Sequence, residues 1–229
     1  MQRCQADKMD KTSMHFEKNY FNYLNYSQKE QMIKRHVLES LKWASKVLRR
    51  DLLNGTGRSA LDVGCAFGYG VSLLNSLGYN TLGTDISSYG LTQGKERLGK
   101  SVFVICDAQE NLPFKGKFDL VTCFEVLEHL KNPLRAVQNM YESCKDVLLC
   151  TTPNKTTERI FKRISRGFDK THINVKTPSE WSEQIRSHIN CSFMRVDCFA
   201  DSNFKVANAL LFKSFKVPFG METRIIVKK

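Results

Sequence analysis

Three predicted strands each end in residues that could hold a polar ligand. A glycine-rich turn, residues 61–70, follows the first strand, Asp85 closes the second, and Asp107 closes the third. Glycines between a strand and a helix let the backbone approach a ligand and leave helix N–H groups facing it. Asp85 lies 21 residues beyond Gly64, where a carboxylate can accept hydrogen bonds from both hydroxyls of a ribose. Each residue alone also fits an ordinary turn or cap, but their joint order favours a nucleoside-binding crevice.

A second group of residues could move a proton or bind a cation. Glu125, Glu128 and His129 are spaced i, i+3 and i+4, so a helical turn would place all three on one face. His172 lies downstream, in a segment at residues 168–174 that we expect to form part of a lid. Two carboxylates and two imidazoles could bind a divalent cation that lowers the pKa of a hydroxyl. The alternatives are a structural His129 that ties a loop to the backbone and an exposed loop position for His172.

Short apolar segments alternate with helical ones through the middle of the chain. The pattern predicts strands at residues 59–63, 80–85, 102–106, 118–123 and 146–151. Helices are expected between them, at residues 69–77, 90–98 and 133–144, the last beginning at Asn132-Pro133. Strands that alternate with helices form βαβ units, so the sheet should be parallel with right-handed crossovers. In open sheets of this kind, ligands bind beyond the carboxyl ends of the strands, which is where the polar residues lie.

The segments that flank this middle have a different character. Residues 14–48 begin with an aromatic stretch and continue as an amphipathic helix. Residues 155–176 are basic and are expected to form an inserted helix and loop, after which Thr177 is a suitable N-cap for another helix. The chain ends in two predicted strands, at residues 193–199 and 222–228, with the apolar segment 207–215 between them.

Composition limits the class of protein. The 229 residues are 41% hydrophobic and 25% charged, which suits one domain with a full core. No stretch reaches the roughly 18 apolar residues of a membrane span, and residues 1–7 lack the apolar region of a secretory signal. The eight cysteines include no C-x-x-C pair and no zinc spacing with histidine, so we expect reduced cysteines that pack in the core. These features predict a soluble, cytoplasmic protein.

The net charge is strongly positive. Lys and Arg number 35 against 23 for Asp and Glu, which gives +12 at pH 7. Such a surplus favours an anionic partner, whether a nucleic acid, an anionic small molecule or a membrane surface, and it also fits an enzyme that is merely basic. Arg159, Lys162, Arg163 and Arg166 would share one face of a helix that could contact a phosphate, touch a membrane peripherally or close a cleft as a lid.

Five motifs together resemble those of class I S-adenosylmethionine-dependent methyltransferases; they lie at residues 61–70, 83–87, 106–108, 118–130 and 147–154. The resemblance covers about residues 58–155. It implies an α/β, Rossmann-like fold: a mostly parallel seven-stranded sheet with helices on both faces and an antiparallel C-terminal strand. A nicotinamide cofactor is disfavoured, because the turn has the pattern Gly-x-x-x-Gly-x-Gly rather than Gly-x-Gly-x-x-Gly.

We expect the chain to divide into two parts. Residues 1–57 would form an N-terminal helical and aromatic lid segment. Residues 58–229 would form the cofactor-binding methyltransferase domain, with a basic lid insertion at about 155–176.

The resemblance implies roles for individual residues. The turn at Gly64 would hold the methionine end of the cofactor, Asp85 its ribose, and Asp107 with Ala108 its adenine. Ala66 stands where many members carry glycine, a minor departure because a small side chain still lets the backbone approach. Tyr20 loosely matches a tyrosine that closes over the cofactor, although it also fits a core position. The predicted cofactor-binding residues are Tyr20, Asp62, Gly64, Cys65, Ala66, Gly68, Asp85, Ile86, Asp107, Ala108 and Phe124.

The resemblance leaves three hypotheses for the acceptor. The first is a methyltransferase for a small-molecule, sugar or lipid-like acceptor, with oxygen favoured over nitrogen as the methylated atom, similar to ubiquinone-pathway O-methyltransferases. It would use S-adenosylmethionine, release S-adenosylhomocysteine, and employ His172 as the acceptor-facing base, with His129 as the second candidate. The residues leave a divalent cation open, and we assign no metal ligand.

The second hypothesis is a metal-assisted RNA 2′-O-methyltransferase. The Glu-x-x-Glu-His pattern at residues 125–129 with a later histidine resembles the metal site of small-RNA 2′-O-methyltransferases, but no RNA-binding module with its own motif is present. The third hypothesis is a catalytically silent cofactor-binding scaffold, against which the intact Asp85 and Asp107 weigh.

Overall fold

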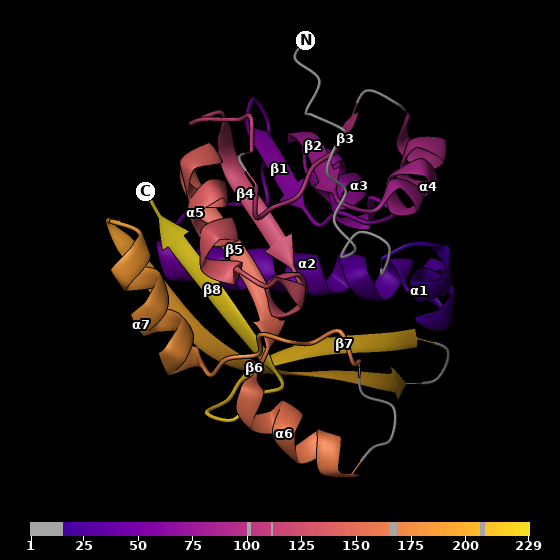
Figure 1. Cartoon of the computed structure of the whole chain (residues 1–229), viewed down its shortest axis with the longest axis vertical. Helices are drawn as coiled ribbons and strands as arrows, with labels where there is room; N and C mark the ends of the chain where they lie inside the picture. The colour runs from indigo at the N-terminus through magenta and orange to yellow at the C-terminus, as the bar shows by residue number, and fades with distance from the viewer. Residues whose placement is uncertain (1–15, 100–101, 111, 165–168, 207–208) are drawn as a thin grey trace.

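A mixed sheet of eight strands forms the centre of the computed structural model, which describes residues 16–99, 102–110, 112–164, 169–206 and 209–229 (Figure 1). The strands lie in the order β3-β2-β1-β4-β5-β8-β6-β7. Their bounds are β1 Ser59–Val63, β2 Asn80–Asp85, β3 Phe103–Ile105, β4 Phe118–Phe124, β5 Cys144–Pro153, β6 Phe193–Val206, β7 Ala209–Lys216 and β8 Glu222–Lys228. The first five strands pair in parallel, whereas β8 runs antiparallel to β5 and β6, and β7 runs antiparallel to β6.

Helices cover both faces of the sheet. Figure 1 shows α5 and α7 over one face, with α2 crossing the other. The helices are α1 Lys18–Tyr23, α2 Glu30–Leu48, α3 Tyr69–Ser76, α4 Ser88–Leu98, α5 Pro133–Ser143, α6 Lys155–Ile164 and α7 Pro178–His188. Two short 3₁₀ turns, η2 at Tyr26–Gln28 and η4 at Leu127–His129, lie between them.

The central strands bury the side chains of both faces. Leu120 of β4 packs in one apolar cluster with Leu41 of α2, and its neighbour Val121 packs in another with Met140 of α5. Successive residues of a strand point to opposite faces, so a strand covered on both sides is a continuous apolar run. This is why residues 118–123 carry no polar alternation and why the central strands were predictable.

The predicted fold class is confirmed. The sheet is mostly parallel, helices lie on both faces, and β8 is the antiparallel C-terminal strand. Two predicted helix starts are also confirmed: α5 begins at Pro133 after Asn132, and Thr177 caps α7. At the second start, the Thr177 hydroxyl accepts a hydrogen bond from the Glu180 backbone at 3.2 Å while the Glu180 carboxylate accepts one from the Thr177 backbone at 2.7 Å.

The described residues contain one strand more than the seven predicted. The extra strand is β7, which lies in the apolar segment at residues 207–215 that was expected to connect two strands. It pairs with an extended β6, from Phe199 opposite Lys216 to Val206 opposite Ala209. A short apolar run without alternation does not distinguish a strand from other buried structure, so no hydrophobic period identified β7 as a strand.

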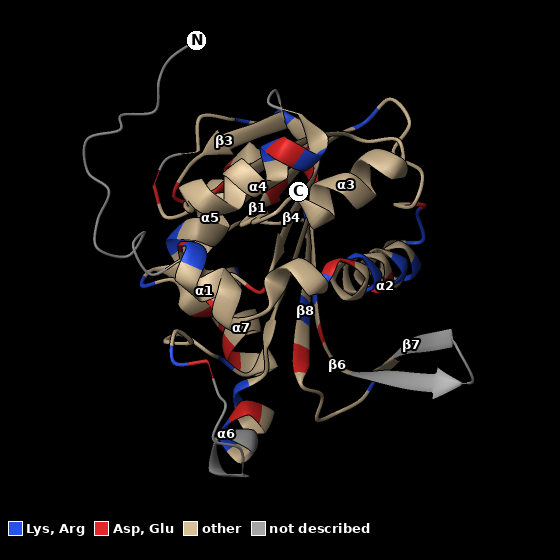
Figure 2. Cartoon of the chain, turned by 90° about the vertical axis from the view of Figure 1, so that its right-hand side faces the viewer, with Lys and Arg blue, Asp and Glu red and all other residues tan. Residues whose placement is uncertain are grey.

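The N-terminal segment contributes to the core through α2. Val37, Leu41 and Ala44 are buried in the same cluster as Leu74 of α3 and Leu149 of β5. The predicted boundary at residue 57 therefore lies between segments that pack together. Figure 2 shows both basic and acidic residues on α2 and on β8.

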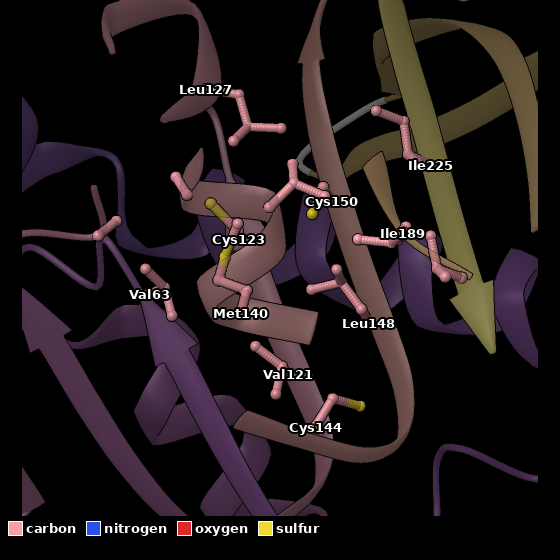
Figure 3. Close-up of a cluster of buried hydrophobic side chains, with 14 of the residues drawn as sticks. Val63, Val121, Cys123, Leu127, Met140, Cys144, Leu148, Cys150, Ile189 and Ile225 are labelled. Atoms are coloured by element: carbon pink, nitrogen blue, oxygen red, sulfur yellow. The ribbon is translucent and has the colours of Figure 1, made fainter. Parts of the chain in front are cut away.

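The cysteines of the described residues behave mostly as small apolar residues. Figure 3 shows Cys123, Cys144 and Cys150 among the aliphatic side chains of the core cluster, and all three are buried. The cysteines at described positions are free thiols, and Cys4 lies outside the described part. Among the helices that the structure describes, none is both long and apolar enough to span a bilayer.

The predicted basic face of the insertion is only partly described. Arg159 of α6 is exposed. Lys162, Arg163 and Arg166 lie outside the residues whose side chains the structure describes, so the shared basic face stays a prediction.

Gly83 offers a test of how tightly the site-bearing edge is packed. A Cβ atom there would lie 2.7 Å from Sγ of Cys65 and 2.9 Å from side-chain atoms of both Phe103 and Val71. We expect Gly83→Ala to lower the free energy of unfolding by about 1–3 kcal/mol, because added volume in a packed core forces its neighbours to shift. The measurement is urea unfolding followed by circular dichroism.

A double variant provides the control. Cys65→Ala removes one of the three atoms in the way, so Gly83→Ala should cost less in the Cys65→Ala background than in the wild type. Equal costs in the two backgrounds would show that the predicted contact is absent.

Candidate functional site

A cavity of about 380 Å³ opens at the carboxyl ends of the parallel strands. The tips of β1 to β4 line it together with residues of α1, α2, η4 and the turn at residues 169–172. Ten of the thirteen predicted site residues lie in this lining: Tyr20, Gly64, Ala66, Asp85, Ile86, Asp107, Ala108, Phe124, His129 and His172. The polar strand ends and the two histidines therefore share one site.

The turn after β1 has the conformation that its glycines predicted. Gly64 and Gly68 have positive φ angles of 75° and 74°, and between them Ala66 has a φ of 46°. A left-handed conformation costs an L-residue roughly 1–2 kcal/mol, so the departure from glycine at Ala66 is strained. The Ala66 backbone N–H donates to Oδ2 of Asp85 at 2.7 Å, which holds the turn in place.

Asp85 links the turn to the next helix. Besides the bond from Ala66, its Oδ1 accepts from the backbone N–H of Ser87 at 2.8 Å. Burial raises the pKa of Asp85, and the backbone N–H groups around it act against this rise. A carboxylate has about four acceptor positions, and the backbone N–H groups of Ala66, Ser87 and Ile86 use three of them, which leaves one for a hydroxyl donor in the cavity. Asp85 is thus placed as the sequence predicted, with a second, structural role.

The end of the third strand, β3, contributes fewer polar side chains to the cavity. Asp107 follows β3, and its Oδ1 accepts from the backbone N–H of Gln109 at 2.8 Å. Ala108 is held by Asn139 of α5, whose side-chain amide donates to the Ala108 carbonyl at 3.0 Å. Gln109 also lines the cavity, a position that the sequence analysis did not single out.

Three predicted cofactor-binding residues do not line the cavity. Asp62 is only 4% exposed and accepts a hydrogen bond from the Thr122 hydroxyl at 2.7 Å, while burial raises its pKa to about 7. Cys65 packs under the turn against Gly83, and Gly68 lies against Phe103. Because these residues lie next to cavity-lining ones in the chain, their motif could not show which of them point away from a ligand.

The N-terminal segment covers the cavity with aromatic rings. The Tyr20 hydroxyl donates to Oδ2 of Asp169 at 3.3 Å, and the Tyr20 ring lies edge-on to that of His129. Tyr20 therefore faces the histidines, whereas Tyr26, which the sequence analysis did not assign, stacks on Tyr69 of α3 beside the glycine-rich turn. The aromatic stretch pointed to a covering segment, but not to which ring lies where.

A carboxylate attaches this segment to the sheet. Oε1 of Glu17 accepts from the backbone N–H of Ser88, and its Oε2 from that of Tyr89, both at 3.1 Å. These N–H groups are the free donors of the first turn of α4, so an acidic residue is favourable there.

His129 has a defined tautomer. Its Nδ1 lies 2.8 Å from the hydroxyl oxygen of Thr171, and that hydroxyl lies 2.6 Å from Oδ1 of Asp169. The Asp169 carboxylate can only accept, so the hydroxyl proton points to it, and Nδ1 of His129 must donate to Thr171. We assign the proton of neutral His129 to Nδ1 from this network, which leaves a lone pair on Nε2. Burial and the neighbouring His172 lower the pKa of His129 to about 4.

His172 lies beside His129, as the sequence analysis expected. The two ring centroids are 4.8 Å apart, and Nδ1 of His172 lies 3.4 Å from a carboxylate oxygen of Glu158 on α6. The turn that carries His172 is attached to η4, because the backbone N–H groups of Ile173 and Asn174 both donate to the Glu128 carbonyl at 2.9 Å.

Three of these groups could hold a cation. One ligand atom from each of Glu128, His129 and His172 lies within 4.8 Å of the others. Oε1 of Glu128 is buried without a hydrogen-bond partner, and burial together with nearby Glu125 raises the pKa of Glu128 well above its usual range. A carboxylate oxygen and imidazole nitrogens fit a divalent ion, which would supply the positive charge that the buried carboxylate needs.

Glu125 lies outside that group of three. It is exposed, has a φ of 53°, and its Oε1 accepts from the Thr151 hydroxyl at 2.9 Å. The predicted helical turn begins only at Leu127, because η4 is a short 3₁₀ turn. The spacing i, i+3, i+4 therefore does not place all four candidate ligands together.

A third histidine lines the cavity without a signal in the sequence. His36 of α2 forms an ion pair with Glu222 at the start of β8, with Nε2 3.2 Å from Oε2. The two residues lie 186 positions apart in the chain. No local spacing pattern connects them, so this pair could be found only from the structure.

A family model described as a methyltransferase domain matches residues 33–188. The chain belongs to this methyltransferase family. The matched range includes the glycine-rich turn, Asp85, Asp107 and both cavity histidines of the second group. The methyltransferase uses S-adenosylmethionine as its methyl donor, as the resemblance predicted.

Relatives of the methyltransferase include ubiquinone biosynthesis O-methyltransferases. The one from Glaesserella parasuis serovar 5 is 29% identical over 209 residues, covering 70% of this chain and 86% of the relative. The one from Actinobacillus pleuropneumoniae serotype 7 is 30% identical over 163 residues, covering 61% and 68%.

Solved structures share the fold at lower identity. Magnesium protoporphyrin IX methyltransferase from Synechocystis PCC 6803, with bound S-adenosylhomocysteine, has a TM-score of 0.65 and 16% identity, covering 96% of this chain and 100% of that one. A SAM-dependent methyltransferase from Archaeoglobus fulgidus has a TM-score of 0.65 and 19% identity, covering 90% and 99%. These likenesses confirm the Rossmann-like fold.

Asp85 allows a test of the cofactor side of this methyltransferase. We expect Asp85→Ala to weaken S-adenosylhomocysteine binding by about 10- to 100-fold, because hydrogen bonds to a charged group contribute about 1.5–3 kcal/mol. Isothermal titration calorimetry measures the change. Asp119→Asn is the matched control, since Asp119 accepts hydrogen bonds from Ser59 at the opposite end of the strands and should leave the affinity unchanged. Equal affinities of Asp85→Ala and wild type would contradict the ribose assignment.

Proposed function

We propose that this methyltransferase transfers the methyl group of S-adenosylmethionine to an oxygen atom of a small-molecule acceptor that binds beside His129. One observation carries the proposal: His129 lines the cavity, and Thr171 and Asp169 fix its proton on Nδ1, so Nε2, which lies 3.7 Å from Oε1 of Glu128, keeps its lone pair. An oxygen acceptor usually needs a base to take its proton. The names of the relatives, ubiquinone biosynthesis O-methyltransferases, support an oxygen acceptor.

We propose that the cofactor lies across the tips of β1 to β4. In this proposal Asp85 accepts a hydrogen bond from a ribose hydroxyl, Asp107, Ala108 and Ile86 surround the adenine, and the turn at Gly64 and Ala66 faces the methionine end, next to Phe124. Three residues of the first motif support the glycine-rich turn and do not line the cavity: Asp62, Cys65 and Gly68. Tyr20 covers the histidine side rather than the ribose.

The chain's own residues would do four things in the reaction. S-adenosylmethionine, when bound, supplies a methyl group on a positively charged sulfur. The strand tips orient that methyl group toward the acceptor, which is the main requirement for such a transfer. Nε2 of His129 takes the acceptor proton, and Asp169 stabilises the resulting imidazolium through Thr171. The rings of Phe16 and Tyr20 exclude water on this side.

The geometry favours His129 over His172 as the base. Nδ1 of His172 faces Glu158, and its Nε2 lies 4.0 Å from Asp169. We propose that His172 orients His129 and the acceptor. The N-terminal segment, predicted at residues 1–57 and described from residue 16, would be the cover of the site, and residues 58–229 its catalytic part.

A substitution of His129 tests the proposal. We expect His129→Gln to lower kcat for a phenolic or catecholic acceptor by about 10²- to 10⁴-fold, the usual contribution of a general base, with unchanged S-adenosylhomocysteine affinity. The assay follows transfer of a labelled methyl group to a panel of phenols, catechols and matched amines. His188→Gln, an exposed histidine of α7, is the control. Methylation of the amines alone, or an unchanged kcat in His129→Gln, would refute oxygen transfer with His129 as the base.

A divalent cation is a second candidate for activating the acceptor, favoured by the unpartnered Glu128 oxygen. Glu128, His129 and His172 would hold it, and a bound cation would lower the pKa of a coordinated hydroxyl. Nε2 of His129 would then be a ligand, so the two roles of this atom exclude each other.

Thermal unfolding separates the two candidates. If the cation site is real, Mg²⁺ or Mn²⁺ at 100 times its dissociation constant should raise the melting temperature of chelator-treated protein by about 5–10 °C. Glu128→Gln should abolish the rise, whereas Glu110→Gln, an exposed carboxylate elsewhere, should retain it. If neither metal changes the melting temperature of the wild type, the cation candidate is excluded and His129 remains the base.

A further inference from the structure

Helix α2 contributes a third histidine to the cavity wall, besides His129 and His172. His36 lines it together with Met32 and Ile33 of the same helix. The His36 ring lies edge-on to that of Phe124 at the tip of β4, with centroids 5.8 Å apart and planes at 67°. The proposed mechanism gives His36 no role, so its place in the wall needs another explanation.

Buried groups hold His36 from behind. Nε2 of His36 and Oε2 of Glu222 lie 3.2 Å apart and form an ion pair, but their geometry is not that of an aligned hydrogen bond. Oε1 of Glu222 accepts from Nε of Arg224 at 2.5 Å, and the Arg224 guanidinium lies 4.0 Å from the centre of the Phe199 ring. Glu222 is 8% exposed and Arg224 1%. The three side chains form a fixed cluster between α2 and β8.

The cluster carries a net positive charge. Burial by itself lowers the pKa of His36, but Glu222 and Glu125 raise it, Arg224 acts against them, and the result is about 9. Burial raises the pKa of Glu222, but His36 and Arg224 lower it to about 2. At neutral pH the cluster itself therefore holds two cations and one anion, and the exposed carboxylate of Glu125 lines the same cavity near His36.

One donor of this cluster is left for a ligand. An imidazolium has two N–H donors, and Nε2 of His36 is buried against Glu222. The side chain is still 20% exposed, so the rest of the ring borders the cavity. Nδ1 has no hydrogen-bond partner in the described part of the chain. A charged donor on an apolar wall is favourable only when a ligand or water accepts from it.

We propose that Nδ1–H of His36 binds a carboxylate inside the cavity. Two ligands of the reaction can provide it: the cofactor, through its amino-acid carboxylate, and an acceptor that carries a carboxylate on an apolar body. Ile33 packs against the cluster around Ala66, so this wall adjoins the glycine-rich turn, and Met32 and Phe124 offer it an apolar surface. The inference rests on the proposed function, because both ligands belong to that reaction.

The cavity lining contains a matched control. Lys29, which precedes α2, also lines the cavity and could attract an anion, and among the described residues no ion pair holds its side chain. Substituting His36 and Lys29 in parallel shows whether the held imidazolium or general positive charge matters.

The first arm of the test concerns the cofactor. Calorimetry compares S-adenosylhomocysteine with 5′-methylthioadenosine, which lacks the amino-acid end, on the wild type, His36→Gln and Lys29→Gln. If His36 binds the cofactor carboxylate, His36→Gln weakens S-adenosylhomocysteine by at least about 10-fold and leaves 5′-methylthioadenosine unchanged. Lys29→Gln changes neither affinity.

The second arm concerns the acceptor. With S-adenosylhomocysteine at saturation, the same proteins are titrated with 4-hydroxybenzoate and with its neutral isostere 4-hydroxybenzamide. If His36 binds an acceptor carboxylate, His36→Gln weakens 4-hydroxybenzoate by at least about 10-fold and leaves the amide unchanged.

Either loss supports the inference and names the source of the carboxylate. If His36→Gln weakens the binding of neither S-adenosylhomocysteine nor 4-hydroxybenzoate, the inference is overturned. The same holds if 4-hydroxybenzoate does not bind at all and the affinity for S-adenosylhomocysteine is unaltered. If His36→Gln also weakens the binding of 5′-methylthioadenosine, the variant His36→Lys is measured in its place. Lysine keeps the positive charge, so His36→Lys should keep the preference for the ligand that carries a carboxylate. A wild type that binds neither adenosyl compound would refute the proposed function itself, and the inference with it.

Discussion

The hydrogen bond between the Ala66 backbone and the Asp85 carboxylate determines the shape of the ligand-binding edge. It connects the turn after β1 to the end of β2, and the second bond of Asp85, from Ser87, extends the connection to α4. The left-handed conformation costs Ala66 roughly 1–2 kcal/mol, and a hydrogen bond to a charged acceptor offsets a similar amount. The same carboxylate faces the cavity, so the group that stabilises the turn is also the one available to a ribose.

The cavity contains two histidines in different protonation states. His129 is buried beside another imidazole, which lowers its pKa to about 4 and leaves it neutral, with Thr171 fixing its proton. His36 is held by Glu222, which keeps it charged. Environments that push the pKa values of like groups apart often mark different chemical roles. A neutral imidazole suits a base or a metal ligand, and a charged one suits an anion.

Local patterns predicted the central fold and the strand ends, because both depend on residues close together in the chain. Gly64, Asp85 and Asp107 follow strands that could be recognised from apolar runs, and parallel strands bring their ends to one edge. Within the first motif, adjacent residues point to different sides, so the sequence alone could not distinguish Asp62 and Cys65 from the cavity-lining Ala66. The β6–β7 hairpin had no alternation to read. The pair of His36 and Glu222 depends on a distant contact that leaves no local pattern.

Asp169 contacts both the N-terminal segment that covers the cavity and Thr171, which orients the proposed base His129. It uses a different carboxylate oxygen for each contact. Its Oδ2 accepts from Tyr20 of the N-terminal segment, whereas its Oδ1 accepts from the hydroxyl and backbone N–H of Thr171. A ligand that displaced Tyr20 would therefore break one bond of Asp169 and leave those that orient His129. The backbone bonds from Ile173 and Asn174 to the Glu128 carbonyl hold the turn of Thr171 and His172 independently of α1. It follows that the cover can change its position while the tautomer of His129 stays the same.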